Sequence, residues 1–221
     1  MIDLLAVCAH PDDLEVTLGG TFIKAKQEGL KTGLIIFTRG ESSGYALQST
    51  RESEGETAAK IMGLDYFAML DLPDAGVHFN EDSVAALVPH LRKCSPKYIF
   101  TFLEDDYHPD HVAVAKTTKA ASFIAGLKKH SDDDTDWHYD GILYFGVDNK
   151  RNKRRPDVYV DISDVIDIKK AACDAHVSQN VTEFAMNVSK EYGNVAGVEY
   201  AEGIYFGESI TINSFSGLVK K

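Results

Sequence analysis

The strongest constraint on the fold is the alternation of short apolar runs with amphipathic segments, from residue 4 to about residue 127. The apolar runs cover residues 4–9, 32–38, 65–73 and 97–102. The segments between and after them have helical periodicity and cover residues 21–29, 49–63, 81–96 and 112–127. Parallel strands that are buried on both faces read as near-continuous apolar runs. The sequence therefore predicts an α/β fold, with a mostly parallel sheet and helices on both faces.

The last third of the chain has a mixed pattern. Two further apolar runs, 141–147 and 157–163, precede two helical segments, 164–179 and 182–197. The chain has 221 residues, which suits one sizeable core and does not require a second domain. We therefore predict a single domain over residues 1–221.

Two details of the helices can be predicted from single residues. Ser49 or Thr50 can cap the segment 49–63, acidic residues crowd its first turns, and Gly63 can end it. Pro89 lies inside the segment 81–96, where its ring should bend the helix or split it into two short pieces.

Charge and apolar run length exclude two kinds of partner. The formal net charge is -11, and a surface with that excess of acid repels the phosphate backbone of nucleic acids. No apolar run approaches the length of a membrane span or of a signal sequence. The three cysteines, Cys8, Cys94 and Cys173, are far apart and odd in number, as expected in a reducing compartment. We expect a cytoplasmic protein that binds neither membrane nor nucleic acid.

Two similar polar motifs follow two of the predicted strands. The stretch "AHPDD" follows the first strand, and "YHPDH" follows the fourth after a short acidic loop. A single His-Pro-Asp tripeptide is most simply a turn, because proline fixes φ and aspartate bonds its own backbone. Two copies, each with an extra ligand-type residue, favour a metal site. Open α/β sheets bind ligands beyond the carboxyl ends of their strands, where the active site is expected.

The residue types suit catalysis by a metal ion. His10, Asp13 and His111 offer two imidazoles and one carboxylate, the three-ligand pattern of catalytic zinc, although the same set also suits iron(II). Asp12 could accept a proton from water at the metal, and His108 could donate a hydrogen bond or a proton to the substrate. Together these groups would meet the needs of amide hydrolysis.

The motifs "AHPDDLEVTLGG" and "HPDH" resemble the two signatures of the LmbE-like, or PIG-L, zinc deacetylases. The stretches "TRGESSG", "STRESEGETAAKIMG", "LDLPDAG", "AHVSQN" and "YAEGI" extend the resemblance over most of the chain. It implies a Rossmann-like sheet and removal of the N-acetyl group from N-acetylglucosamine-type substrates. "LDLPD" and "YAEG" are most similar to the subgroup that deacetylates N-acetylglucosaminyl-malate in bacillithiol synthesis.

The resemblance implies a role for each matching residue. The zinc ligands would be His10, Asp13 and His111. Asp12 would be the general base, and His108 would polarise the amide carbonyl or protonate the leaving amine. Asp110 would orient His108 through a hydrogen bond.

The substrate contacts implied by the resemblance lie outside the two motifs. Arg51 would contact the substrate, and Asp74 would contact sugar hydroxyls. The bacillithiol-type subgroup often has an arginine before HPDH, where this chain has Tyr107. A tyrosine does not offer the fork that suits a carboxylate. Tyr107 could hydrogen-bond the oxyanion or a sugar hydroxyl, or could simply pack the loop. The subgroup also includes hexamers, so we expect a homo-oligomer, with a hexamer as one candidate.

Several charged residues allow two interpretations. The basic run "NKRNKRRP", residues 149–156, could recruit an anionic substrate group or could be a solvated loop. The acidic residues 104–106 could tune the site but more simply form an exposed loop. Glu15 could support a ligand histidine or merely begin a helix. His176 is expected to be a surface or structural histidine.

Two other functions stay open at this level. A related amidase that cleaves thiol S-conjugates would need a large pocket beyond Arg51 and Asp74. A non-catalytic sugar- or metal-binding module would leave Asp12 and His108 without a task. A dinucleotide enzyme is disfavoured, because "TLGG" lacks the glycine spacing that cradles a pyrophosphate.

Overall fold

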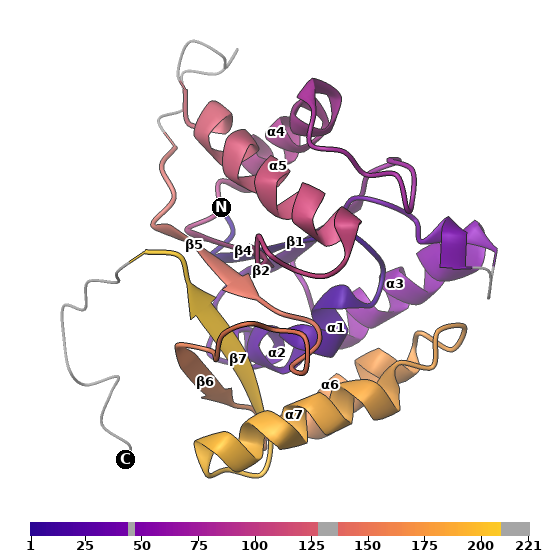
Figure 1. The fold of residues 1–221 in the computed structure, drawn as a ribbon, viewed down its shortest axis with the longest axis vertical. Coiled ribbons are helices and arrows are strands. Elements are labelled where there is room, and N and C mark those ends of the chain that lie inside the picture. Colours follow the sequence, from indigo (N-terminus) through magenta and orange to yellow (C-terminus); the bar gives the residue numbers. More distant parts are fainter. Residues whose placement is uncertain (44–46, 128–136, 209–221) are drawn as a thin grey trace.

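A computed structural model describes residues 1–43, 47–127 and 137–208. Its centre is a seven-stranded sheet with the strand order β3-β2-β1-β4-β5-β7-β6 (Figure 1). The strands are β1 (Leu4–Cys8), β2 (Thr32–Ile36), β3 (Tyr66–Met69), β4 (Tyr98–Phe102), β5 (Gly141–Phe145), β6 (Val158–Asp161) and β7 (Ala201–Phe206).

The sheet is mostly parallel, which confirms the predicted fold class. Strands β3, β2, β1, β4 and β5 run parallel to one another, and only β7 runs antiparallel to its neighbours β5 and β6. The chain builds β1, β2 and β3 in one direction and then returns to place β4 on the other side of β1. The carboxyl ends of β1 and β4 therefore form the switch point of the sheet, where such folds bind ligands.

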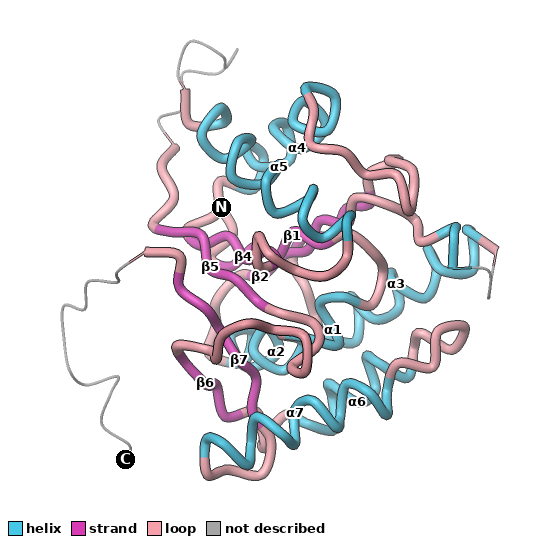
Figure 2. The backbone as a smooth tube through the Cα atoms, viewed as in Figure 1, coloured by secondary structure: helices cyan, strands magenta, loops and turns pink. Residues whose placement is uncertain are grey.

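Helices cover both faces of the sheet (Figures 1 and 2). Helices α4 (Glu81–Cys94) and α5 (Pro109–Ala125) pack against each other on one face. The helices of the other face are α1 (Asp13–Thr17), α2 (Gly19–Gln27), α3 (Gln48–Met62), α6 (Ile166–Asp174) and α7 (Thr182–Ala196).

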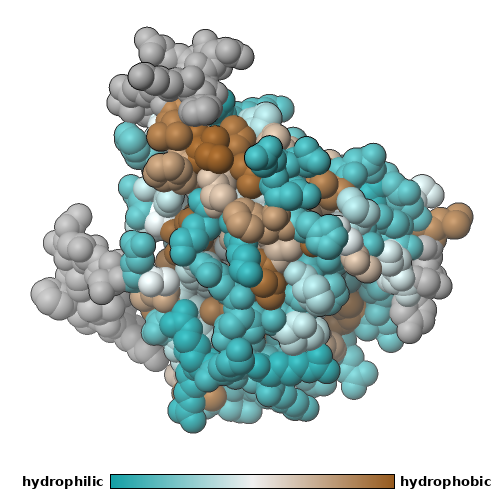
Figure 3. All heavy atoms as spheres, turned by 45° about the horizontal axis from the view of Figure 1, so that its top comes forward, coloured by the Kyte–Doolittle hydropathy of each residue, from teal (hydrophilic) through white to brown (hydrophobic). Residues whose placement is uncertain are grey.

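The core consists of the central strands and the helix faces packed on them. Residues 5–9, which form most of β1 and the residue after it, are fully buried, as expected for a strand covered on both faces. Phe22 of α2 meets Phe100 of β4 edge to face, with ring centres 5.4 Å apart. The outer surface is largely hydrophilic on the face seen in Figure 3, with a hydrophobic cluster at one end. Within the described ranges, no helix is both long and apolar enough to cross a membrane.

The helix details are partly as predicted. Gly63 ends α3 with a left-handed φ of 70°, as expected, but the capping prediction is wrong, because the helix begins after Leu47 without a side-chain cap. Pro89 does not split its helix into two pieces, since α4 runs through it as one helix. Helix α5 begins at Pro109, so the second motif forms its first turn instead of preceding it.

A buried ion pair fixes α1 and α2 against β7. Lys169 Nζ lies 2.6 Å from the Glu202 carboxylate and donates to the Val16 carbonyl of α1 at 3.0 Å. The same carboxylate accepts from the backbone amides of Gly20 and Thr21 at the start of α2. Both charged side chains are almost completely inaccessible. This network holds the helix that carries Asp13.

Candidate metal centre

The two motifs meet at the switch point of the sheet. The chain leaves β1 and turns at His10 into α1, and it leaves β4 through residues 103–108 into α5. His10, Asp13 and His111 each offer one ligand atom, and these atoms all lie within 4.8 Å of one another. Asp13 and His111 are buried, and His10 is largely so. Two imidazoles and a carboxylate at this spacing fit a zinc or iron(II) ion.

Carboxylates orient His10. Its Nε2 lies 3.1 Å from Asp74 Oδ1 and 3.3 Å from Asp110 Oδ2, while its Nδ1 lies 3.5 Å from Asp13. Metal-binding histidines commonly give their second ring nitrogen to a carboxylate, which fixes the ring and its tautomer. The arrangement leaves Nδ1 as the His10 atom that faces the other ligand groups.

His111 has the same kind of support from Asp106. Its Nδ1 lies 3.0 Å from Asp106 Oδ1, and its Nε2 lies 3.4 Å from Asp13 Oδ1. The Asp106 side chain is 1% exposed, whereas Glu104 and Asp105 are exposed as expected. The interpretation of all three acids as an exposed loop is therefore wrong for Asp106. No feature of the sequence distinguishes Asp106 from its two acidic neighbours.

The charges of the cluster reinforce one another. Burial disfavours a charged His10, but the carboxylates of Asp110, Asp13 and Asp74 outweigh it and raise the His10 pKa to about 12. Burial also disfavours a charged His111, but the carboxylates of Asp13 and Asp106 outweigh it and raise the His111 pKa to about 9. The pKa of Asp13 lies well below its usual range, because the two imidazoles outweigh its burial. The cluster therefore has a strong affinity for positive charge.

Asp12 has an unusual backbone conformation at the edge of this cluster. Its φ is 107°, which is uncommon for a residue other than glycine, and it is the residue that precedes α1. Such strain costs on the order of 1–3 kcal/mol and concentrates at functional sites. Burial and the adjacent Asp13 charge raise the Asp12 pKa to about 7, although Arg51 and His176 oppose this. A carboxylate with a pKa in this range suits a general base.

Arg51 uses most of its donors inside the protein. It is 3% exposed, and it donates to the carbonyls of Gly40 and Pro11 and to Asp12 Oδ2. Gly40 has a φ of 68°, and a Cβ there would collide with the guanidinium group. Arg51 therefore lies where it supports Asp12, and its contact with the substrate stays a prediction.

His108 caps α5 and lies beside the cluster. Its Nδ1 accepts a hydrogen bond from the Asp110 backbone amide at 3.2 Å, and its ring stacks on that of His111 with centres 4.6 Å apart. Burial and the neighbouring His111 and His10 lower its pKa. Because Nδ1 is an acceptor, Nε2 carries the proton in the neutral ring. Tyr107, which precedes His108, is 48% exposed at the rim.

Asp110 and Asp74 both lie against His10. Asp110 was expected to orient His108 through a hydrogen bond; its backbone amide donates one to His108 Nδ1, while its carboxylate accepts from the amides of Ala75 and Val77 and faces His10. The Asp74 carboxylate contacts His10 and accepts from the Ser42 amide, and its contact with sugar hydroxyls stays a prediction. The His10 contact lowers the Asp74 pKa to about 2. Both acids therefore orient a ligand histidine.

A second buried pair lies behind Asp12. Glu15 is paired with His176 at 3.4 Å, and both side chains are almost inaccessible. Burial disfavours a charged His176, but Glu15 outweighs it and raises the His176 pKa. Glu15 thus supports a histidine, as one interpretation held, but not a ligand histidine. His176 is structural, as expected.

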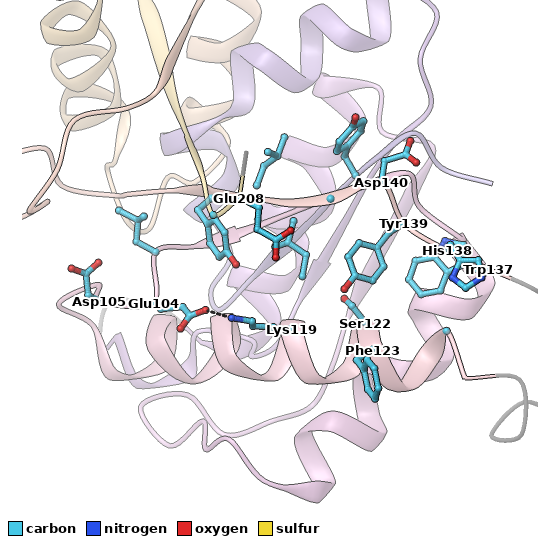
Figure 4. A pocket seen from close by; sticks show the side chains of 18 of the residues that line it. Glu104, Asp105, Lys119, Ser122, Phe123, Trp137, His138, Tyr139, Asp140 and Glu208 are labelled. Carbon is cyan, nitrogen blue, oxygen red and sulfur yellow. Dashed lines mark hydrogen bonds and ion pairs between the residues drawn. The ribbon is translucent and has the colours of Figure 1, made fainter. Parts of the chain in front are cut away.

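Neither of the two cavities described here contains the three ligand residues. The larger, of about 1060 Å³, lies along α5 and β5 and is lined by Lys119, Phe123 and Tyr139 among others (Figure 4). The smaller, of about 240 Å³, is lined by residues that include His78 and Asp110.

His10, His108 and Asp110 form a second possible metal group. Each Asp110 oxygen accepts a backbone amide, whereas the two amides at Asp13 both donate to Oδ2 and leave Oδ1 for an ion, so the group with Asp13 fits an ion better.

An open α/β sheet with a two-histidine, one-carboxylate cluster at its switch point has the donor set and the position of a candidate metal-binding enzyme site. The chain belongs to the PIG-L family, described as GlcNAc-PI de-N-acetylase, which its residues 5–122 match. This match confirms the family resemblance of the two motifs.

Named relatives and a solved structure agree with the family. The diacetylchitobiose deacetylase of Thermococcus kodakarensis is 28% identical, over 92% of this chain and 82% of that protein. A probable N-acetyl-alpha-D-glucosaminyl L-malate deacetylase 2 of Bacillus cereus is 26% identical, over 80% of this chain and 83% of that protein. The crystal structure of the conserved protein TT1542 from Thermus thermophilus superposes with a TM-score of 0.88 at 35% identity, covering 96% of this chain and 97% of that one.

Proposed function

We propose that this protein is a metal-dependent hydrolase that removes the N-acetyl group from an N-acetylglucosamine-containing substrate. The products are acetate and a free amine. Zinc is the proposed ion, and N-acetylglucosaminyl-malate is the first candidate substrate. The observation that carries the proposal is the convergence of His10, Asp13 and His111, from motifs a hundred residues apart, beside the strained Asp12.

Two lines of support favour deacetylation over mere binding. Two named relatives are deacetylases, one named for the neutral sugar diacetylchitobiose and the other for a glucosaminyl malate, whose aglycone is charged. Asp12 and His108 also have positions that suit proton transfer, and a binding module would not need either group. The donor set His10, Asp13 and His111 would hold the metal, which lowers the pKa of water to about 7 and polarises the amide carbonyl.

The proposed chemistry divides between two protein groups. Asp12, kept in place by Arg51 and by its own backbone conformation, accepts a proton from the attacking water. His108 donates a hydrogen bond from Nε2 to the oxygen that becomes negative, and the proton that Asp12 takes from water passes to the leaving nitrogen. The buried carboxylates of Asp106 and Asp110 keep the two ligand histidines from rotating.

We propose further that the protein is a cytoplasmic homo-oligomer, with a hexamer as the first candidate. The three cysteines are buried and free, as expected in a reducing compartment. Large apolar side chains such as Phe123 and Phe184 are exposed, which favours an interface. Light scattering of the full chain tests the oligomer: a monomer at micromolar concentration would contradict it.

Acetate release tests the proposed activity. The zinc-loaded protein is incubated with N-acetylglucosaminyl-malate, with N,N'-diacetylchitobiose and with free N-acetylglucosamine, and acetate and free amine are measured together. We expect equal amounts of acetate and amine from at least one of the glycosides. If none of the three substrates releases acetate, the proposed function is wrong.

A further inference from the structure

The basic run 149–156 lies against the loop that carries the second motif. Lys153 Nζ is 3.2 Å from the Asp105 carboxylate of that loop. The guanidinium carbon of Arg151 lies 4.3 Å from the centre of the Tyr107 ring. These contacts place the run, which is mostly exposed, beside the loop of the second motif and at the rim of the candidate metal centre.

The Tyr107 ring lies between Arg151 and the predicted ligand His111. The centre of the Tyr107 ring is 6.3 Å from the ring centre of His111 and 6.3 Å from that of His108. Tyr107 is half exposed, so the arginine on its face is at the rim of the site. A sugar whose acetamido group reaches the metal ligands can direct a substituent toward this rim.

The loop around Arg151 is fixed on both sides. The Asp148 carbonyl accepts from the amides of Arg151 and Asn152, each at 3.0 Å, which closes a turn. The Asn152 amide group donates to the Tyr205 hydroxyl at 3.0 Å, and Arg154 donates to a backbone carbonyl of β7. A guanidinium held in this way loses less conformational entropy when it binds a ligand.

The Arg151 guanidinium retains free donors. Its Nε lies 3.3 Å from the Asp148 carboxylate, and the side chain is 59% exposed. Within the described part of the chain, its two terminal nitrogens make no hydrogen bond to the protein. The planar fork of an arginine matches a carboxylate or a phosphate in two hydrogen bonds.

Two other cations near Tyr107 and the metal ligands are paired with carboxylates of the protein, Lys153 with that of Asp105 and Arg51 with that of Asp12. The guanidinium of Arg51 is buried and its contacts are internal. The carboxylates gathered at the site belong to Asp12, Asp13, Asp74, Asp106 and Asp110. Such a cluster repels an anionic ligand unless cations compensate for it. An exposed arginine at the rim would be unnecessary for a neutral glycoside.

We propose that Arg151, held on the Tyr107 ring, forms an anion-binding subsite for a carboxylate or phosphate on the aglycone side of the substrate. The inference rests on the proposed function, because it assumes that an amino sugar occupies the site. It predicts a preference for an anionic over a neutral amino-sugar glycoside. The subsite determines specificity and takes no part in the proton transfers.

Equilibrium binding of the deacetylated sugars tests the subsite without requiring turnover. Glucosaminyl-malate, glucosamine 1-phosphate and methyl glucosaminide are titrated into the zinc-loaded full chain by calorimetry. The comparison uses wild type, Arg151→Gln and Arg155→Gln, a matched control. Arg155 belongs to the same run and is exposed, and among the described residues it makes no contact with the Tyr107 ring.

The expected result is tighter binding of one charged ligand than of the neutral one, with that ratio reduced about tenfold in Arg151→Gln and retained in Arg155→Gln. The charged ligand that shows the effect identifies the anion as carboxylate or phosphate. An unchanged ratio in Arg151→Gln, or no preference in the wild type, would overturn the subsite. Acetate release is measured separately, so a failed deacetylase and a failed subsite give different results.

A double-mutant comparison separates a direct contact from a general loop effect. Tyr107→Ala removes the ring on which Arg151 rests and should lower the same ratio. The double variant with Arg151→Gln should lower it little further, since both changes act on one contact. Additive losses would contradict the coupling. The preference should also weaken as the salt concentration rises, because the arginine is partly exposed.

Discussion

Asp106 Oδ1 lies 3.0 Å from His111 Nδ1, and this contact holds the imidazole so that Nε2 faces Asp13. The pair joins a loop residue to a ligand in the first turns of α5. Loss of such a partner leaves the ligand ring free to rotate and less basic. The contact therefore bears directly on metal affinity.

The Asp106→Ala variant should bind zinc about 10- to 100-fold more weakly than the wild type. Competition with a chromophoric chelator measures the change. Glu104→Ala is the matched control, because its carboxylate faces Lys119 on the surface instead of a ligand. Equal affinities of Asp106→Ala and wild type would show that the Asp106 contact does not support the metal.

Asp12→Asn should separate metal binding from catalysis. Asparagine also tolerates a positive φ, so the backbone at this position need not change. The variant should retain nearly normal zinc affinity, and kcat should fall by about 10²–10⁴ because the general base is lost. Zinc content and steady-state acetate release are measured on the same preparation. Normal turnover would remove Asp12 from the role of base.

The buried pair of Lys169 and Glu202 should be costly to break. Lys169→Met leaves the carboxylate without its cation in an inaccessible site, which should lower the free energy of unfolding by about 3–5 kcal/mol. Adding Glu202→Gln should recover part of the loss. Lys170→Met removes an exposed neighbour and should cost no more than about 1 kcal/mol. Denaturant unfolding provides the values, and equal losses in the two lysine variants would contradict this account.

Asp65 should contribute a pH-dependent part of the stability. Burial opposes its charge, but the ion pair with Lys26 and the Thr32 amide lower its pKa. A carboxyl group whose folded pKa lies below its unfolded value stabilises the protein above the unfolded pKa, about 3.9, and loses that effect as the pH falls through the folded pKa.

The unfolding free energies of wild type and Asp65→Asn should therefore differ by a constant amount near neutral pH. That difference should shrink below about pH 4, where Asp65 becomes protonated in the wild type. Chemical denaturation at a series of pH values from neutral to acidic measures it. A difference that stays constant over the whole range would show that the charge of Asp65 contributes nothing.

The sequence predicted the sheet because its parallel strands are continuous apolar runs. Strand β7 was not predicted, since "AEGIYF" contains Glu202 and Gly203. The charge of the buried Glu202 is neutralised by Lys169, which lies 33 residues away in the sequence. The start of α5 was placed too late, because histidine is not among the usual capping residues and His108 caps that helix.

The ligand set could be predicted because each motif follows a strand, and the two strands are neighbours in the sheet. The partners of the ligands could not. Asp74, Asp106 and Asp110 approach the ligand histidines from three different segments, and their pairing depends on loop conformation. Spacing in the sequence does not determine which carboxylate meets which ring nitrogen.

The most direct test of a metal-dependent deacetylase is a zinc titration of the stripped protein, with acetate release as the readout. The two possible metal groups share His10, so one ion per chain should suffice. We predict no release after chelation, activity that rises to a plateau at about one equivalent of zinc, and none in His111→Ala at that loading. Full activity in the stripped protein, or wild-type turnover in His111→Ala, would contradict the central claim.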